Sequence, residues 1–346
     1  MAPGGDTMLA AVYQGDRTMT VEHLPIPTPA ADEVLVEVSH CGICGTDLHY
    51  VLEGWGRPGS VNGHEYSGLV VGIGDDVTDV VLGARVVGGP SRGCGRCQPC
   101  ARGKTNLCAE RDVVGTAPFQ GAFARYKTLG SDSVYVLPDT LDLRTAALAE
   151  PVAVALRGVR RSGVQAGDRA LVTGAGPIGL LTVALLRALG VDDITVSEPH
   201  ERRRDLAVDV GATRAAAPDA FPEPTAPTEI VAEPYDAAIE CSGRADAITM
   251  GLSHLARGGT LVLSGTGLVR PRFDSIRIIV HELTVTGSME YTPDDFTSGI
   301  ELIASGRLPT DLLIEGTDVP LSGVLPAMER LAAGELAAKV MVTPDA

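Results

Sequence analysis

The sequence predicts an α/β protein in which a largely β domain precedes a parallel, doubly wound sheet. Two observations support this prediction. Short β-branched runs between glycines fill residues 1–150, and strands alternate with helices over residues 151–291. The 346 residues are enough for two domains, and the shares of hydrophobic (45%) and charged (21%) residues are typical of a globular chain.

The acidic composition argues against two classes of binding partner. A formal net charge of −16 argues against nucleic acid and disfavours anionic membrane surfaces, because both need clustered Lys and Arg. The first residues, MAPGGDTMLAAVYQGDR, lack a secretory signal, and the most apolar helical segment, GLLTVALLRALG, is too short to cross a bilayer. We expect a cytoplasmic protein whose seven cysteines are reduced, so clustered cysteines are better metal ligands than disulfide partners.

The first domain is expected to span residues 1–150, with a loose tail before Met8. Its strands are read from β-branched and leucine-rich runs that end near glycines, namely EVLVEVS, GLVVGIG and GARVVGG.

The second domain is expected to span residues 151–291. DRALVTG predicts its first strand, and the helix that follows places Leu181, Ala184, Leu185 and Ala188 on one face. Later strands are expected at DDITVSE, YDAAIECSG, GGTLVLSG and HELTVTGS. Residues 215–234, with five prolines, are interpreted as a surface excursion, and residues 292–346 as a segment that returns to the first domain.

A glycine-rich turn lies between the first strand of the second domain and its helix. VTGAGPIGL places Gly174, Gly176 and Gly179 in G-x-G-x-x-G spacing, with Pro177 and Ile178 between the last two glycines. Such glycines permit a tight turn and close approach of the backbone to a pyrophosphate at the helix N-terminus. The motif alone is weak, but this strand-to-helix context is the one that indicates dinucleotide binding.

Glu198 bears on the choice of cofactor. It lies nineteen residues after Gly179, at the end of the next predicted strand. A carboxylate there can accept hydrogen bonds from the adenosine ribose diol but repels a 2′-phosphate, by about a few kcal/mol at near contact. Arg203, with its neighbours Arg202 and Arg204, could soften that repulsion, although a solvated helix face is the simpler interpretation. We expect NAD rather than NADP.

A cysteine cluster predicts a structural metal site. CGRCQPCARGKTNLC places Cys94, Cys97, Cys100 and Cys108 at C-x2-C-x2-C-x7-C spacing. Four thiolates can close a tetrahedral shell around Zn²⁺ with no open position. An iron–sulfur cluster is the alternative, but the usual ferredoxin run has three residues and a proline around its last cysteine. We expect zinc to stabilise this lobe by roughly 10 kcal/mol of apparent binding energy and to take no part in catalysis.

A second metal site is suggested by HCGICGTDLHY, residues 40–50, whose thiols and imidazoles would also suit a redox pair. Downstream, NGHEYSG supplies His64 and Glu65, and ALAEPVAVAL supplies Glu150. Catalytic zinc needs about three protein ligands and one exchangeable position. Cys44, His64 and Glu65 are the expected ligands, with Glu150 near the fourth place.

The motifs CGICGTDLH, GHE, the four-cysteine lobe, AEP and GAGPIG occur in the order found in zinc-dependent medium-chain alcohol dehydrogenases. The chain from about Met8 resembles that family along its length, and most of all the branch with sorbitol, butanediol and threonine dehydrogenases. The resemblance implies a GroES-like catalytic domain with two zinc ions, a Rossmann domain that binds NAD, and an active site in the cleft between them. It also implies homodimers or homotetramers, formed in part by edge strands near residues 276–287.

By the same resemblance, Cys44, His64 and Glu65 bind the catalytic zinc, and Glu150 is a fourth or intermittent ligand. A cation eases loss of the alcohol proton, and the carbon then gives hydride to the nicotinamide. The resemblance also implies a proton relay. Its first member is Thr46, beside the substrate oxygen and the cofactor. Its outer member, towards solvent, is His49, and an imidazole suits that position because it titrates near neutral pH.

Two positions depart from the family pattern. Arg157 stands where this branch often has a histidine, and we expect no catalytic consequence. Glu290 stands before Tyr291, where sorbitol-dehydrogenase-like relatives have an arginine that helps to hold the polyol. A carboxylate there would favour a substrate with an amine or several hydroxyl donors and would disfavour an acid. Tyr50 and Trp55 are further candidates for the pocket wall.

The sequence therefore predicts a zinc- and NAD-dependent oxidoreductase that converts a small-molecule secondary alcohol, polyol, cyclitol or amino alcohol to the ketone. One alternative is an NADP-dependent carbonyl reductase with the same machinery. Another is a non-enzymatic dinucleotide-binding zinc protein, which would show gaps among the catalytic ligands or the relay, and the sequence shows none.

Overall fold

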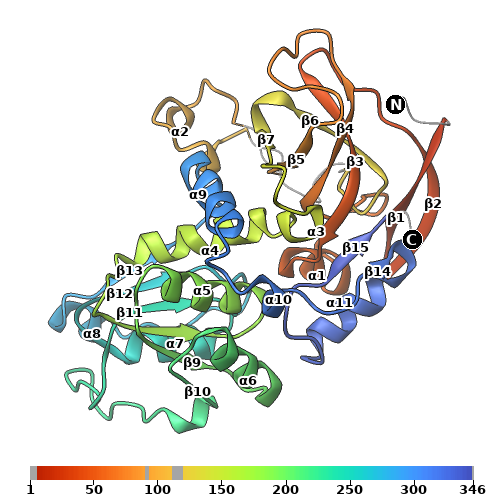
Figure 1. Cartoon of the computed structure of the whole chain (residues 1–346). Helices are drawn as coiled ribbons and strands as arrows, with labels where there is room; N and C mark the ends of the chain where they lie inside the picture. Colours follow the sequence, from red (N-terminus) through yellow and green to blue (C-terminus); the bar gives the residue numbers. More distant parts are fainter. Residues whose placement is uncertain (1–5, 90–92, 111–119, 345–346) are drawn as a thin grey trace. The chain divides into compact units, whose positions relative to one another are not determined.

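The protein is described by a computed structural model that covers residues 6–89, 93–110 and 120–344. The chain divides into two compact units (Figure 1). Unit 1 consists of Met1–Glu150, Thr292–Ser305 and Ile314–Ala346, and unit 2 consists of Pro151–Tyr291 and Gly306–Leu313.

Unit 1 is built on a seven-stranded, largely antiparallel sheet and a two-stranded hairpin. Its strands are β1 (Thr7–Gly15), β2 (Thr18–Pro25), β3 (Glu33–Gly42), β4 (Glu65–Ile73), β5 (Arg85–Gly88), β6 (Tyr126–Gly130), β7 (Val134–Val136), β14 (Val319–Pro320) and β15 (Met341–Thr343). The sheet has the order β14-β15-β3-β4-β5-β7, with β6 also paired to β3. The three strands expected from the sequence are therefore confirmed as β3, β4 and β5, and β3 lies at the centre of the core because its valines are buried.

The helices of unit 1 are short and pack around this sheet. They are α1 (Gly45–Leu52), α2 (Gln98–Ala101), η1 (Thr105–Leu107), η2 (Ser131–Ser133), α3 (Leu143–Ala146), α9 (Pro293–Ala304), η4 (Leu321–Gly323) and α11 (Val324–Ala332). The longer α4 (Ala149–Ser162) begins in unit 1 and continues into unit 2.

Unit 2 contains a six-stranded parallel sheet. Its strands are β8 (Arg169–Thr173), β9 (Asp193–Ser197), β10 (Arg214–Ala216), β11 (Tyr235–Glu240), β12 (Leu255–Leu263) and β13 (Thr284–Gly287). The order β10-β9-β8-β11-β12-β13 reverses direction between β8 and β11, which confirms the predicted doubly wound fold. Ligands of such sheets bind outside the carboxyl ends of the strands at that reversal, where Thr173 pairs with Glu240.

Helices flank this sheet (Figure 1). They are α5 (Pro177–Ala188), α6 (Glu201–Val210), η3 (Pro218–Ala220), α7 (Ala245–Ser253), α8 (Ser275–Val280) and α10 (Thr310–Leu313), together with most of α4. Because parallel crossovers are right-handed, the helices after β8 and β9 lie on one face and those after β11 and β12 on the other.

Helix α5 differs from the amphipathic helix that the sequence predicts. Residues 179–186 are all buried, and not only the expected face. The reason is that α5 packs against β8 and β9 on one side and against α6 and α10 on the other.

Helix α10 lies in Gly306–Leu313, a stretch that the sequence interpretation assigned to the first domain but that groups with unit 2. Arg307 donates a hydrogen bond to the carbonyl of Ala188 and so ties this stretch to the end of α5.

The proline-rich residues 215–234 contain only the end of β10 and the single turn η3. Arg277 anchors the segment, since its guanidinium donates a hydrogen bond of 2.8 Å to the carbonyl of Glu229. The segment therefore lacks a core of its own and depends on a buried cation of α8 for its position.

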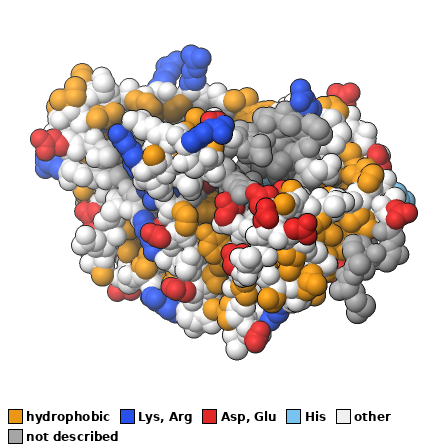
Figure 2. Space-filling view, turned by 90° about the horizontal axis from the view of Figure 1, so that it is seen from above, with side chains coloured by type: hydrophobic (Ala, Val, Ile, Leu, Met, Phe, Trp, Pro, Cys, Tyr) orange, Lys and Arg blue, Asp and Glu red, His pale blue; other side chains and the backbone are white. Residues whose placement is uncertain are grey.

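No helix among the described residues is both long and apolar enough to cross a membrane. On the face drawn in Figure 2, acidic side chains gather in one group near the middle, whereas Lys and Arg side chains are scattered. This distribution follows the excess of acidic residues in the composition.

Candidate active site and metal centres

Three side chains expected to hold a catalytic metal lie together in unit 1. The ligand atoms of Cys44, His64 and Glu65 are all within 4.8 Å of one another. The pairing of β3 with β4 brings them together, because Gly42, near Cys44, is the register partner of Glu65. Gly63, with a φ of +89°, allows the turn into His64, since a Cβ there would lie 2.7 Å from an aromatic ring.

The unpaired atoms of this group fit a metal ion. Glu65 is fully buried, and its Oε1 accepts a hydrogen bond of 2.7 Å from Lys339 Nζ, while Oε2 has no hydrogen-bond partner. The ring Nδ1 of His64 is likewise buried and unpaired, 3.8 Å from Asp47 Oδ1. A buried carboxylate oxygen left unpaired beside a thiol and an imidazole is costly unless a cation satisfies it. This donor set suits Zn²⁺.

Burial acts against the charged forms of these ligands. It raises the pKa of Cys44 to about 12 and raises the pKa of Glu150 well above its usual range. Metal ligands must be deprotonated, so a bound divalent cation would oppose both shifts. The site is therefore electrostatically prepared for an ion rather than for free thiolate chemistry, which disfavours the redox-pair interpretation.

Glu150 lies next to this group but is not part of it. The residue is buried at the start of α4, and its carboxyl interacts electrostatically with His64, Glu65 and Cys44. Its oxygens are outside the set of ligand atoms within 4.8 Å. The arrangement matches a carboxylate beside three closer ligands, as the sequence interpretation expected.

Two supporting residues were missed by the sequence interpretation. Asp47 is fully buried, and its carboxylate accepts backbone N–H groups of Cys44 (2.9 Å) and Gly63 (3.2 Å), so it fixes both chain segments that carry ligands. Lys339 donates to the carbonyl of Ile43 (3.0 Å) as well as to the buried carboxylate of the metal group. Asp47 could have been found from its capping position three residues after Cys44. Lys339 gives no local signal, because its partner lies 274 positions away.

The expected proton relay lies on one helix. Thr46 and His49 are three residues apart in α1, so they share a face of that helix. The imidazole of His49 stacks on the indole of Trp55, with 4.6 Å between ring centroids and 12° between planes. Tyr50 follows on α1 and is half-buried. The structure thus brings Trp55, a candidate for the pocket wall, against the relay histidine.

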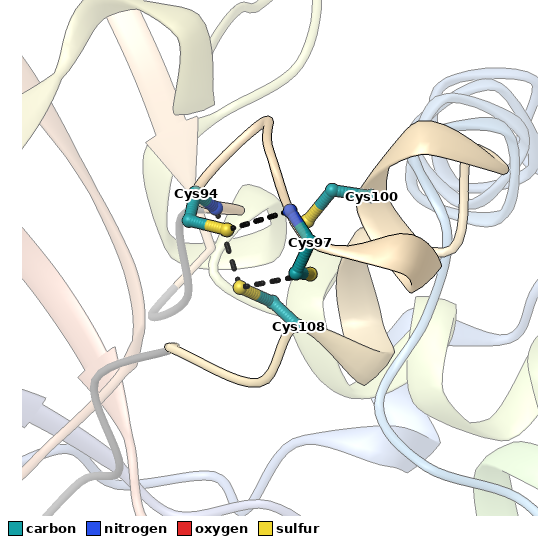
Figure 3. A group of neighbouring side chains, drawn as sticks. All are labelled: Cys94, Cys97, Cys100 and Cys108. Atoms are coloured by element: carbon teal, nitrogen blue, oxygen red, sulfur yellow. Dashed lines mark hydrogen bonds between the residues drawn. The ribbon is translucent and has the colours of Figure 1, made fainter.

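The four-cysteine cluster forms a second centre, in which the side chains point toward one another (Figure 3). All four sulfurs lie within 4.8 Å of one another, and those of Cys97 and Cys108 are 4.0 Å apart. A tetrahedral zinc with Zn–S bonds of about 2.3 Å places its sulfurs about 3.8 Å apart. An iron–sulfur cluster holds its cysteines on separate irons and so needs wider spacing. The geometry therefore fits one zinc ion.

Backbone N–H groups point at these sulfurs. Cys94 N and Glu110 N lie 3.2 Å and 3.3 Å from Cys108 Sγ, and Cys97 N lies 3.3 Å from Cys94 Sγ. Backbone hydrogen bonds lower the pKa of Cys97 to about 6, whereas burial raises the pKa of Cys100 to about 12. N–H donors stabilise thiolates, which are the ligand form.

The glycine-rich turn of unit 2 has a cradle for a ligand. Gly174 (φ +92°) and Gly179 are needed for close packing, because a Cβ would lie 2.9 Å from Ser242 at the first position and 1.9 Å from a carbonyl at the second. At Gly176, by contrast, a Cβ would meet nothing within 4 Å. Open space at the middle glycine, with Pro177 and Ile178 starting α5, fits a pyrophosphate above the helix N-terminus.

Glu198 is more constrained than the sequence suggests. It is almost fully buried, Oε2 accepts from Ala175 N at 2.7 Å, and Oε1 accepts from His200 N at 3.0 Å. The neighbouring arginine that braces this turn is Arg204, which donates to the carbonyl of Glu198 at 2.9 Å. Arg203, the arginine expected near the cofactor, lies one residue earlier on α6 and is half-buried.

Glu290, the third candidate for the pocket wall, belongs to unit 2, whereas Tyr50 and Trp55 belong to unit 1. Its backbone has a φ of +48°, a left-handed conformation that is uncommon for residues other than glycine. Such conformations cluster at functional sites.

Comparisons with known proteins cover both units. Residues 30–139 match the alcohol dehydrogenase GroES-like domain, and residues 177–305 match the zinc-binding dehydrogenase family. The chain is 34% identical over 355 residues to a sorbitol dehydrogenase of Bacillus subtilis (strain 168), with 98% of each chain covered. It is 34% identical over 319 residues to D-xylulose reductase A of Aspergillus oryzae (strain ATCC 42149 / RIB 40), with 89% of each covered.

A solved structure shows the same architecture. A zinc-binding dehydrogenase from Sinorhizobium meliloti 1021, bound to NADP, aligns with a TM-score of 0.87 at 32% sequence identity. The alignment covers 98% of this chain and 100% of that one. The likeness therefore extends over both units and includes a dinucleotide-bound relative.

Proposed function

The chain belongs to the family of zinc-dependent medium-chain alcohol dehydrogenases, and from that membership we propose that it oxidises a secondary alcohol to a ketone with NAD as hydride acceptor. The proposed substrate class is a polyol, a cyclitol or an amino alcohol. The observation that carries the proposal is the group of Cys44, His64 and Glu65, whose ligand atoms lie within 4.8 Å of one another and include a buried, unpaired oxygen of Glu65.

Each residue of the site has a distinct task. Zn²⁺, when bound, supplies the Lewis acidity that lowers the pKa of an alcohol hydroxyl. Cys44, His64 and Glu65 would hold it, and Lys339 neutralises one oxygen of Glu65 so that the other is left for the metal. Asp47 and Lys339 do not bind the metal themselves. They hold the ligand residues in place through hydrogen bonds, as residues around metal sites generally do.

The proton and the hydride leave by different routes. Thr46 accepts the hydroxyl proton and passes its own proton on towards His49, from which it reaches solvent. The glycine turn of unit 2 would hold the pyrophosphate of NAD, whose nicotinamide, when bound, supplies the hydride acceptor.

A substrate panel tests the proposal. We expect NADH formation with at least one member of a set of diols, polyols, cyclitols and amino alcohols, together with about two zinc ions per chain by metal analysis. A chain with one zinc and no activity on any member would instead support the non-enzymatic alternative.

We propose NAD rather than NADP on the basis of Glu198. Its carboxylate is fixed by Ala175 N and His200 N, and each oxygen retains a lone pair for a ribose hydroxyl. A 2′-phosphate would meet a buried negative charge. The NADP-bound relative from Sinorhizobium meliloti shows that the fold accepts NADP as well.

Replacing Glu198 by glutamine is expected to reduce the ratio of kcat/KM for NAD to that for NADP by about tenfold to hundredfold, because the charge that repels the phosphate is lost. Glutamine keeps the size of the side chain and one acceptor oxygen for the turn. Glu201→Gln, on the first turn of α6, is the matched control and should leave the ratio unchanged. An unaltered ratio in the Glu198 variant would support the carbonyl reductase alternative.

We propose Tyr50 and Trp55 of unit 1, and Glu290 of unit 2, as residues that contact the substrate. A carboxylate at Glu290 would attract an amine or several hydroxyl donors and would repel a carboxylate substrate. In the panel, amino alcohols or polyols should therefore be better substrates than hydroxy acids of similar size.

We also propose that the chain forms homodimers or homotetramers through the β13 edge of the unit 2 sheet. Strand β13 has one neighbour, β12, and the adjacent α8 exposes Ile276, Ile279 and Val280. A second copy would cover this apolar surface and the open strand edge.

All seven cysteines are free, which supports a reducing, cytoplasmic location.

A further inference from the structure

We propose that Glu53 and Trp55 are positioning residues of the proton relay, which hold the imidazole of His49 in one tautomer and one plane. The inference rests on the proposed function, because it assigns His49 to proton transfer. It adds two residues outside the motif that suggested the relay. Both lie just beyond α1 in unit 1.

The first observation is an ion-pair contact on the solvent side of His49. Nδ1 of His49 lies 3.0 Å from Oε1 of Glu53, four residues later on the same helical face. Nδ1 is itself buried and makes no linear hydrogen bond, so the attraction is mainly coulombic. The carboxylate is half exposed, with 51% of its side-chain surface open to solvent. The carboxylate of Glu53 therefore contacts the ring on one side and solvent on the other.

This contact selects the tautomer of His49. With an acceptor beside Nδ1, the neutral ring carries its proton there, and Nε2 is left with the lone pair that receives the relayed proton.

The second observation is the stack of Trp55 on His49, which a fixed turn maintains. Glu53 N and Trp55 N both donate to the carbonyl of His49, each at 3.3 Å, and Gly54 takes a φ of +76°. Gly56 N donates to the carbonyl of Tyr50 at 3.0 Å. The chain thus folds back over the end of α1 and lays the indole parallel to the imidazole. An indole face also favours a cationic ring.

The proton transfer leaves Glu53 unchanged overall. The relayed proton forms a bond to Nε2 of His49, and the Nδ1–H proton passes by way of Oε1 of Glu53, 3.0 Å away and half exposed, to water. Proton exchange at the neutral ring then restores its starting tautomer. One proton leaves for each alcohol oxidised, and no electrons pass through these residues.

Trp55 is the single tryptophan of the chain, so its emission reports the stack on His49 without any catalysis. At one fixed pH we expect Glu53→Gln to change the emission of Trp55, because the imidazole loses the carboxylate that holds it. His49→Gln should change the emission as well, because it removes the stacked ring. The matched control, Glu335→Gln, removes an exposed, ion-paired carboxylate elsewhere in unit 1 and should leave the emission unchanged.

Proton release, followed with a pH indicator in a single turnover, tests the role in the reaction. We expect Glu53→Gln to slow release by about threefold to fivefold at one fixed pH. Glu53→Asp should recover part of the rate, and Trp55→Phe should be faster than Trp55→Leu.

The outcomes separate the two levels of inference. Emission of Glu53→Gln equal to that of the wild type overturns the positioning role whatever the activity. A normal emission series in a protein that oxidises no alcohol would sink the proposed function instead and leave the His49–Glu53 pair standing.

Discussion

Cys44→Ser is expected to reduce kcat/KM for the best alcohol by about three orders of magnitude or more and to lower the zinc content from about two ions per chain to about one. The thiolate is the softest of the three expected ligands, and a serine hydroxyl stays protonated near neutral pH and cannot replace it. The imidazole and carboxylate that remain hold zinc poorly, because structural and catalytic sites use at least three protein ligands. Metal analysis and steady-state kinetics on the same preparation check both parts.

The loss should be chemical rather than structural. Cys44 is the N-cap of α1, a position where serine is a favoured residue, so the helix should persist. Cys41→Ser is the matched control, since Cys41 is buried three residues away but lies outside the group of ligand atoms. It should keep both zinc ions even if its stability falls. Loss of zinc from Cys41→Ser, or full activity in Cys44→Ser, would mean that the wrong thiol has been assigned.

Local spacing explains why so much of both metal centres was visible in the sequence. The four-cysteine cluster spans only Cys94 to Cys108, so its loop must bring the sulfurs together whatever the rest of the chain does. The glycine turn is read in a similar way, because Gly174 has a φ of +92° and a Cβ at Gly179 would lie 1.9 Å from the carbonyl oxygen of Gly174, although Ser242 also crowds Gly174 from further along the chain. Strand periodicity likewise identifies β3, β4 and the parallel strands, since alternation and burial are properties of short segments.

Contacts between distant segments explain what was missed. Lys339 donates its hydrogen bond to Glu65 only because β15 pairs with β3. No sequence pattern near residue 339 indicates a buried cation. The same holds for α5, whose outer face is covered by α10 from much later in the chain. Trp55 was expected near the substrate, but its stack on His49 could not be predicted, because it depends on a turn that contains Gly54 and Gly56. Residues that belong to a short sequence motif can therefore be predicted from the sequence, whereas residues defined only by tertiary contacts cannot.

Cys108→Ser is expected to release the structural zinc and to unfold the lobe of residues 93–110 locally. Within that range only Asn106 and Cys108 are buried, so the lobe has almost no apolar core to hold it without the metal. Zinc-binding free energy in such closed sites is folding free energy, with apparent values on the order of 10 kcal/mol. Hydrogen exchange of the lobe should therefore rise by several orders of magnitude, while zinc analysis shows one ion remaining.

The activity of this variant distinguishes a structural from a catalytic ion. If the four-cysteine site only stabilises its lobe, Cys108→Ser should keep most of its kcat at low temperature and lose activity much faster than the wild type on heating. Cys241→Ser, in unit 2, is the matched control and should retain two zinc ions and normal exchange in the lobe. Immediate loss of kcat at low temperature with the lobe still protected would contradict the assignment. Iron with visible absorption in the wild-type protein would contradict it as well, because four sulfurs within 4.8 Å of one another surround one ion and leave no room for a cluster.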